Sequence, residues 1–310
     1  MKKNQTVTIV MYHYVRPISN SDFPSIKGLE IKGFQRQLDY LQENYTIVNS
    51  DEIIDSILKN KFLPQNACWL TFDDGFKDHI NYVLPELLSR KICGTFFPPE
   101  AAIRKSIMLN VHSIQHILSC SENIDKIIQD INILSKRSGI SDDQINYFYK
   151  NFGIASRYDN ANTIYVKRML QRLLPEKIRN SIVKKLFKKY VDISEENFSK
   201  KLYMNTKEVS KLIKNGMSVG SHGSMHYWLN EISSQKQKIE ILKSLEFLEE
   251  VGASTSNWIM CYPYGAYNND TLKLIKKLGA SIGVTTQIGK ANISDNPFLL
   301  PRFDTNDFPQ

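Results

Sequence analysis

The stretch ACWLTF, Ala67 to Phe72, is followed directly by Asp73-Asp74-Gly75, and this combination indicates the fold most clearly. A short apolar run that ends in Asp-Asp-Gly is typical of a buried strand closed by a tight turn. Apolar residues at helical spacing lie on both sides of it, in Ile31 to Asn44 and in Phe76 to Arg90. A buried strand between two helices is the repeating unit of parallel α/β folds.

The same alternation runs through most of the chain. We expect further strands at Thr6 to Val15, Gly94 to Phe97, Met217 to Gly220, Trp258 to Tyr262 and Ser281 to Thr286, and further helices at Asp51 to Lys59, Thr206 to Asn215, Ser233 to Glu250 and Asp270 to Leu278. Asp51 is the predicted cap of its helix. Between about 103 and 202 strand signals stop and helical periodicity dominates. We therefore predict one α/β domain over 1–310, with a helical insertion at about 103–202 that packs on one side of a barrel.

Composition is that of an ordinary soluble globular protein, with 42% hydrophobic and 23% charged residues among 310. The sequence contains no run of 18 or more apolar residues, so no transmembrane helix is predicted. The chain begins Met-Lys-Lys, but the apolar stretch Val7 to Val15 has no small-residue cleavage site after it, so it favours a first strand over a signal peptide. The four cysteines form no C-x-x-C pair, which favours buried free thiols over a zinc–cysteine site. These features predict a cytoplasmic protein.

The net charge of +8 is concentrated in one segment, residues 161–190, which holds nine basic residues and the single acid Glu176. Two interpretations are open. The segment can form two short amphipathic helices with solvated lysines, or it can make a peripheral contact with anionic lipid headgroups or an anionic glycan carrier. Nucleic-acid binding is not expected, because no aromatic platform or known module accompanies the charge.

Polar clusters follow three of the predicted strands: Asp73-Asp74-Gly75, Ser221 to His226 and Pro263 to Gly265. In α/β barrels the reactive groups lie at the carboxyl ends of the strands, so these clusters are expected to share one site. His222 and His226 are four residues apart and can lie on one side of a helical turn, as divalent-metal ligands do. One aspartate can be the third ligand and its neighbour a general base. Alone, each motif is more often a surface coincidence or a simple turn.

Together the motifs resemble a known family. TFDDG (71–75), SHGSMH (221–226) and YPYG (262–265) are similar to the first three signature motifs of the polysaccharide deacetylases, carbohydrate esterase family 4, and the opening MYHYVRP agrees. The resemblance covers residues 7–100 and 203–305. It implies a distorted (β/α) barrel with fewer than eight regular units, and metal-assisted hydrolysis of an N-acetyl group.

The resemblance also implies roles for individual residues. It implies three ligands for zinc or a similar divalent ion: Asp74, His222 and His226. Asp73 would be the general base, and the backbone N–H of Tyr264 would help hold the oxyanion. The flanking Pro263 and Gly265 are expected to contact the substrate. Hydrogen bonds from Ser221 and Ser224 are expected to support the histidines.

Two positions depart from the family pattern. The family commonly has an arginine two positions before the Pro-Tyr pair, where this chain has Cys261, so Arg302 is the candidate to steady the base; the alternative is a surface arginine. The family commonly has a late histidine, and this chain has none after His226. His13 is the candidate general acid, against a packed histidine on a buried strand. His79 is expected to be solvated.

These observations predict a carbohydrate N-deacetylase that acts on an N-acetylated sugar, such as a surface-polysaccharide or lipopolysaccharide precursor. Two alternatives stay open: an amidase with a non-sugar substrate, and a glycan-binding relative that has lost catalysis. A further pair, His112 and His116, lies in the insertion without an acidic partner and is not expected to bind metal; a structural role and a substrate-lining role are both open.

Overall fold

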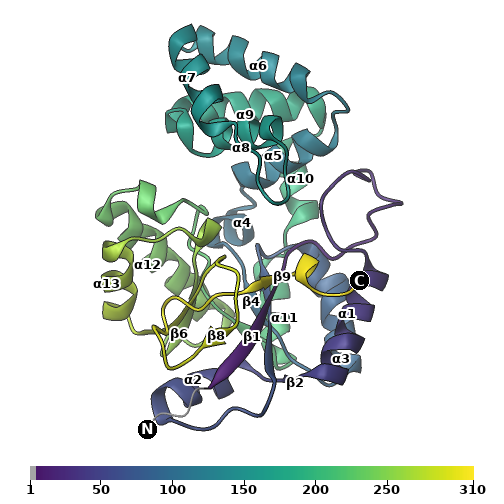
Figure 1. Ribbon diagram of the computed structural model, residues 1–310, viewed down its shortest axis with the longest axis vertical. Coiled ribbons are helices and arrows are strands. Elements are labelled where there is room, and N and C mark those ends of the chain that lie inside the picture. Colours follow the sequence, from purple (N-terminus) through teal and green to yellow (C-terminus); the bar gives the residue numbers. More distant parts are fainter. Residues whose placement is uncertain (1–4) are drawn as a thin grey trace. The chain divides into compact units, whose positions relative to one another are not determined.

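The computed structural model describes residues 5–310, and the Met-Lys-Lys start lies outside the described residues. The chain divides into two compact units (Figure 1). We call residues up to Pro17, Gly28–Ser106 and Lys200–Gln310 the barrel unit, and Ile18–Lys27 with Ile107–Ser199 the helical unit. The helical unit covers most of the predicted insertion and also takes in residues 18–27, which the sequence pattern did not assign to it.

The barrel unit is built on a mostly parallel sheet. Strands β5 (Ser218–Val219), β4 (Thr95–Phe97), β3 (Ala67–Asp73) and β1 (Thr6–Tyr12) lie side by side in that order, all parallel. The short β2 (Thr46–Ile47) also pairs with β3, and β9 (Phe303–Asp304) pairs with β1 in parallel. β8 (Ala291–Asn292) is antiparallel to the start of β1.

Two further strands and two single bridges close the sheet. β6 (Trp258–Cys261) and β7 (Ala280–Val284) form a parallel pair. A parallel bridge from Ser221 to Met260 joins the end of β5 to β6, and another from Val284 to Leu300 joins β7 to the segment before β9. Because β9 pairs with β1, the strands form a closed ring that is regular on one side only. The predicted distorted (β/α) barrel is confirmed.

Helices flank this ring, and most begin with a side-chain cap. Their bounds are α1 (Ile31–Asn44), α2 (Ser50–Lys59), α3 (Leu84–Ser89) after the π-helical turn η1 (His79–Val83), α4 (Glu100–Lys105), α11 (Thr206–Lys214), α12 (Ser234–Val251) and α13 (Asn269–Lys277). Asn49 and Glu52 form a capping box on α2, so the cap is Asn49 and not the predicted Asp51. α11 and α13 begin in the same way, at Asn205 and Asn268.

Alternation along β3 decides what points into the barrel. Successive side chains of a strand face opposite sides, so Ala67, Trp69, Thr71 and Asp73 share a face. Ala67 and Trp69 are fully buried in the interior cluster. On the other face Phe72 stacks against Tyr12 and Phe96, with ring centroids 5.0 and 4.7 Å apart. Asp73, the last residue of β3, is therefore the carboxylate that completes the inward series at the carboxyl end of the strand.

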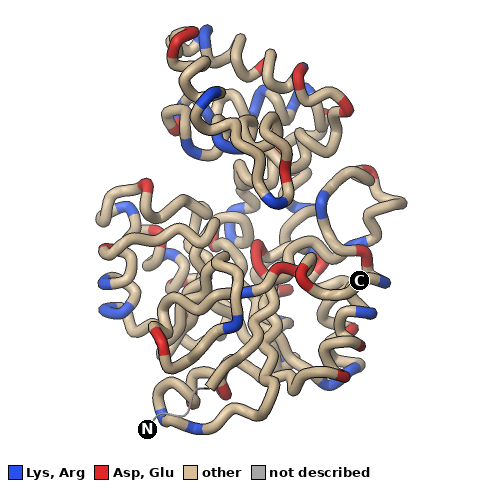
Figure 2. Tube along the Cα trace, viewed as in Figure 1, with Lys and Arg blue, Asp and Glu red and all other residues tan. Residues whose placement is uncertain are grey.

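The helical unit contains α5 (Asn110–Ser119), α6 (Ile124–Arg137), α7 (Asp142–Phe152), α8 (Ala161–Arg168), α9 (Glu176–Tyr190) and most of α10 (Glu195–Leu202). In the basic segment the apolar side chains, among them Ile182, Val183 and Phe187, are buried, while the lysines are mostly exposed. Figure 2 shows the Lys and Arg positions along these helices. The amphipathic-helix interpretation fits this burial. The lipid-contact interpretation is not supported, because the apolar face of these helices already packs in the core of the unit.

The four cysteines differ in burial. Cys68 and Cys261 are buried, as predicted, but Cys93 is half-buried and Cys120 is exposed. All four thiols are free. Among residues 5–310, no helix has both the length and the apolar character needed to cross a membrane.

Candidate active site

A left-handed turn follows Asp73 and begins at Asp74. Asp74 and Gly75 both have positive φ, at 72° and 66°, and the Asp74 N–H donates to the Phe97 carbonyl at 3.1 Å. A Cβ on Gly75 would lie 2.7 Å from Cβ of Pro98, so only glycine fits there. Because of this turn, the Asp74 side chain does not continue the alternation of side chains along β3 that ends at Asp73. Both carboxylates are buried, and they can take different roles.

The histidine motif is a loop, which corrects the expectation of a helical turn. Ser221 pairs with Met260 in a bridge, and His226 has φ of 56°. The loop nevertheless brings the two imidazoles together: Nε2 of His222 lies 3.1 Å from Nε2 of His226. Oδ1 of Asp74 lies 3.4 Å from each of these nitrogens.

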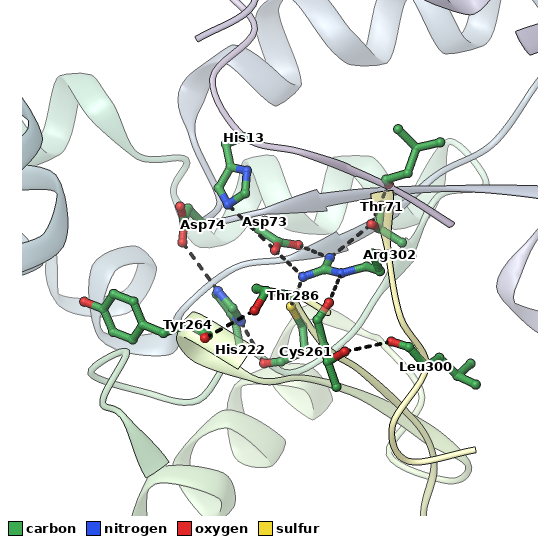
Figure 3. Close-up of polar contacts among 12 residues, drawn as sticks. His13, Thr71, Asp73, Asp74, His222, Cys261, Tyr264, Thr286, Leu300 and Arg302 are labelled. Atoms are coloured by element: carbon green, nitrogen blue, oxygen red, sulfur yellow. Dashed lines mark hydrogen bonds and ion pairs between the residues drawn. The ribbon is translucent and has the colours of Figure 1, made fainter. Parts of the chain in front are cut away.

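These three atoms fit a divalent metal ion. In a tetrahedral site with ligands at about 2.0–2.2 Å, ligand atoms lie roughly 3.3–3.6 Å from one another. The observed separations of 3.1 and 3.4 Å are close to that range. Nδ1 of His222 lies 2.8 Å from the Cys261 carbonyl oxygen, which can only accept a hydrogen bond. Nδ1 therefore carries the proton, and the Nε2 lone pair points toward Asp74 (Figure 3).

Two buried glutamates hold the histidine loop. One carboxylate oxygen of Glu240, on α12, accepts from the backbone N–H groups of Ser224 and Met225 at 3.1 and 2.7 Å. The Ser224 hydroxyl donates to Glu100 of α4 at 2.6 Å. The serine thus supports the histidines through the loop backbone and not by a direct bond. Burial raises the pKa of Glu240, and the two N–H groups oppose that rise.

Sequence reasoning missed both glutamates. A signal was present in α12, where Gln237, Glu240 and Ser244 share the buried face that an amphipathic helix normally fills with apolar residues. Ser244 in turn donates to the hydroxyl of Ser221 at 2.8 Å. This polar stripe lies directly behind the loop.

Arg302 lies against Asp73, 1% exposed, so it is not a surface arginine. Its two terminal nitrogens donate to the two carboxylate oxygens of Asp73 at 2.8 Å each, in a bidentate fork (Figure 3). Further bonds to the Thr285 carbonyl and the Thr71 hydroxyl fix the guanidinium. Burial alone would raise the pKa of Asp73, but the Arg302 charge outweighs it and the pKa falls to about 2. Asp73 is ionised at neutral pH.

The guanidinium also accounts for Cys261. This side chain occupies the place where the family commonly has its arginine, and Arg302 donates to its sulfur at 3.3 Å. Burial raises the pKa of the Cys261 thiol. A neutral thiol at this position leaves room for the guanidinium of Arg302, which comes from the segment before β9.

His13 lies on the open side of Asp73, just after β1. Its Nε2 is 3.9 Å from Asp73 Oδ2, and 40% of its side chain is exposed. His79 is fully buried, which contradicts the expected solvated position. Its Nε2 donates to the His13 carbonyl at 3.0 Å, and burial lowers its pKa to about 4. His79 therefore fixes the backbone of His13 as a neutral donor.

Tyr264 lies in the short 3-10 turn η4 (Pro263–Gly265) with φ of 59°. Its ring stacks on Trp228 at 4.4 Å and meets the edge of His226 at 4.6 Å. Gly265 also has positive φ, and a Cβ there would lie 2.2 Å from the Thr286 hydroxyl. Sequence reasoning did not single out Trp228. Pro263 is buried, and Gly265 is half-buried.

The other histidine pair belongs to the helical unit. His112 and His116 are buried on α5, and His116 packs edge-on against Phe23 and Phe198 at 4.9 and 4.6 Å. Neither belongs to a group of possible metal ligands among residues 5–310, where such groups form only around Asp73, Asp74, His222, His226 and Cys261.

A family model and a curated relative each match about a third of this chain. The family model described as polysaccharide deacetylase matches residues 180–283. That range contains both histidines of the loop and Pro263 to Gly265, and it leaves out Asp73 and Asp74. A curated relative, "Putative polysaccharide deacetylase YxkH" of Bacillus subtilis (strain 168), is 30% identical over 102 residues, or 33% of this chain. The match spans 36% of the relative's length.

Solved structures share the fold over nearly the whole chain. The deacetylase PplD of Streptococcus pyogenes, in complex with acetate, has a TM-score of 0.60 at 17% identity, and the match covers 97% of this chain and 93% of PplD. IcaB from Ammonifex degensii has a TM-score of 0.56 at 17% identity, covering 96% and 91%. A de-N-acetylase from Aggregatibacter actinomycetemcomitans has a TM-score of 0.56 at 15% identity, covering 97% of this chain and 96% of that protein. At these identities the likeness concerns the fold alone.

Proposed function

We propose that this chain is a member of the polysaccharide deacetylase family and a metal-dependent hydrolase that removes the acetyl group from an N-acetylated sugar. The observation that carries the proposal is the convergence of Asp74, His222 and His226, with ligand atoms 3.1–3.4 Å apart, beside the ionised carboxylate of Asp73. Zinc is the ion we propose, because the donors are two imidazoles and one carboxylate.

The chemistry divides between the ion and the side chains. A divalent ion held by these three residues would polarise the amide carbonyl and lower the pKa of a nearby water. Asp73 would take a proton from the attacking water as the water oxygen bonds to the carbonyl carbon of the acetyl group. The N–H of Tyr264 would donate to the oxygen that gains negative charge. Arg302 would act as a positioning residue that orients Asp73 and keeps it ionised.

His13 would complete the reaction. Its imidazolium would donate a proton to the leaving nitrogen as the carbon–nitrogen bond breaks, which releases acetate and a free amine. The proton on Asp73 can then pass back to His13, whose Nε2 lies 3.9 Å from Oδ2 of Asp73. One water is consumed and both groups return to their starting state. Pro263 and Gly265 would shape the substrate side of the turn that carries Tyr264.

Acetate release tests the proposal directly. We expect release from N-acetylglucosamine oligomers, lipid-linked sugars or nucleotide sugars, with a loss on the order of 10²–10⁴-fold in Asp73→Asn. Asp51→Asn, at an exposed position of α2, is the matched control and should keep full activity. Release from simple non-sugar amides only would favour the amidase alternative. Equal rates in Asp73→Asn and the unaltered protein would refute the proposed base. The sugar and the cytoplasmic location stay predictions.

A further inference from the structure

The helical unit holds a pocket of its own. The cavity measures about 440 Å³ and is lined by residues 25–27 together with residues from α5, from α6 and the turn before it, and from α8 and the segment before it. Small-molecule sites in proteins typically measure about 300–1,000 Å³. All of the lining residues belong to the helical unit, so the pocket does not depend on the barrel.

The charges of the pocket cancel. Lys27 and Lys167 both donate to Asp159, at 2.7 Å to Oδ1 and 2.6 Å to Oδ2. Lys27 also donates to the Tyr158 carbonyl at 2.6 Å. Glu122 is the remaining charged residue in the lining, which makes two basic and two acidic groups. An anionic ligand would have to separate the lysines from Asp159, whereas an uncharged ligand leaves this arrangement intact.

The rest of the lining combines neutral polar groups with an apolar base. Hydroxyl and amide side chains come from Gln115, Ser119, Asn160 and Thr163, among others. Buried Ile26 and Ile127 contribute apolar surface. Tyr158, on the same lining, is 44% exposed. A sugar ring has a matching chemistry, with apolar C–H faces and hydroxyl groups around its edge.

We propose that this pocket binds an uncharged sugar residue, as a second glycan site separate from the metal site. The choice of a sugar rests on the proposed function; the size and neutrality of the pocket do not. A glycan chain that bound there would be held at a sugar residue other than the one being deacetylated. Its effective concentration at the protein would then rise for long substrates more than for single sugars.

Hydrogen exchange by mass spectrometry can locate the binding. The His222→Ala protein, with both units present, should not turn over substrate and is mixed with an N-acetylglucosamine tetramer. We expect slower exchange in peptides from 115–127 and 158–167. Ser119→Trp, which fills the pocket, should abolish that protection, and Ser138→Trp, at the exposed end of α6, should retain it. Protection that persists in Ser119→Trp, or none in the helical unit of the parent, overturns the proposal.

A gentler variant guards against misfolding. Thr163→Val keeps the shape of the side chain but removes a hydroxyl from the pocket, while the Thr163 backbone N–H still donates to the Asn160 side chain that caps α8. We expect at least a fivefold weaker tetramer affinity by calorimetry; an unchanged affinity counts against the site. Inorganic phosphate that protects the same peptides would overturn the choice of an uncharged ligand. Failure of acetate release by the unaltered protein would refute the proposed function and leave this binding result standing.

Discussion

Replacing Arg302 by methionine would leave Asp73 as a buried charge without its partner. The guanidinium is fully enclosed and makes two hydrogen bonds of 2.8 Å to that carboxylate, with others to Thr71, Thr285 and Cys261. Removing one partner of a buried ion pair typically costs about 3–5 kcal/mol. We expect Arg302→Met to lower the free energy of unfolding of the barrel unit by that amount, and to impair acetate release as well.

Tryptophan fluorescence during denaturant unfolding measures the effect. All three tryptophans, Trp69, Trp228 and Trp258, lie in the barrel unit, so the signal reports that unit. Arg36→Met, at an exposed position of α1, is the control and should change the free energy of unfolding by less than about 0.5 kcal/mol.

A double variant separates the lost partner from lost packing. If the unpaired charge causes the damage, Arg302→Met with Asp73→Asn should be more stable than Arg302→Met alone, because no charge is then left buried. Should Arg302→Met cost less than about 1 kcal/mol, the pair is no more than a surface-type salt bridge and the reasoning about Asp73 is wrong.

Three further variants test other parts of the structure. Glu240→Ala should weaken metal binding about 10–100-fold, because the loop N–H groups lose their acceptor; metal titration measures it, with exposed Glu246→Ala as the control. Gly75→Ala should cost about 2–5 kcal/mol, from the left-handed backbone and the 2.7 Å approach to Pro98, and an unfolding midpoint equal to that of the unaltered protein would contradict the turn geometry. Burial would raise the pKa of Asp159, but Lys167 and Lys27 lower it overall, so its contribution to stability exists above the ordinary value of 3.8 and fades as the pH falls below it. The stability gap between the unaltered protein and Asp159→Asn, measured by hydrogen exchange in the helical unit, should therefore shrink from about pH 6 to about pH 3; a constant gap would contradict the pairing.

The regular half of the barrel was predictable because its signals are local. The apolar run before Asp73 and the 3.6-residue spacing in α1 each reflect a single element and its burial. The closure of the barrel was not predictable, because it depends on strands of two residues and on single bridges such as Val284 to Leu300. Elements this short contain too few residues to show a period.

The active site likewise has features that could be predicted from sequence and features that could not. The metal-ligand candidates could be named from sequence: strand ends and motif spacing indicate that the clusters share one site, and the family resemblance implied that Asp74, not Asp73, is the ligand. The loop conformation of Ser221 to His226 could not, since an i, i+4 spacing of histidines does not distinguish a helix from a turn with positive φ. His79 was expected to be solvated because it follows the Asp-Asp-Gly turn by one helical turn, yet the aromatic rings of Phe72 and Phe76 pack against it.

The central claim is that Asp74, His222 and His226 hold one divalent ion. A crystal structure of zinc-loaded protein, with anomalous scattering measured at the zinc edge, tests it most directly. We predict one ion bound by Asp74 Oδ1 and by Nε2 of both histidines, at about 2.0–2.2 Å. An ion bound elsewhere, or no anomalous peak between these three side chains at saturating zinc, would contradict the account.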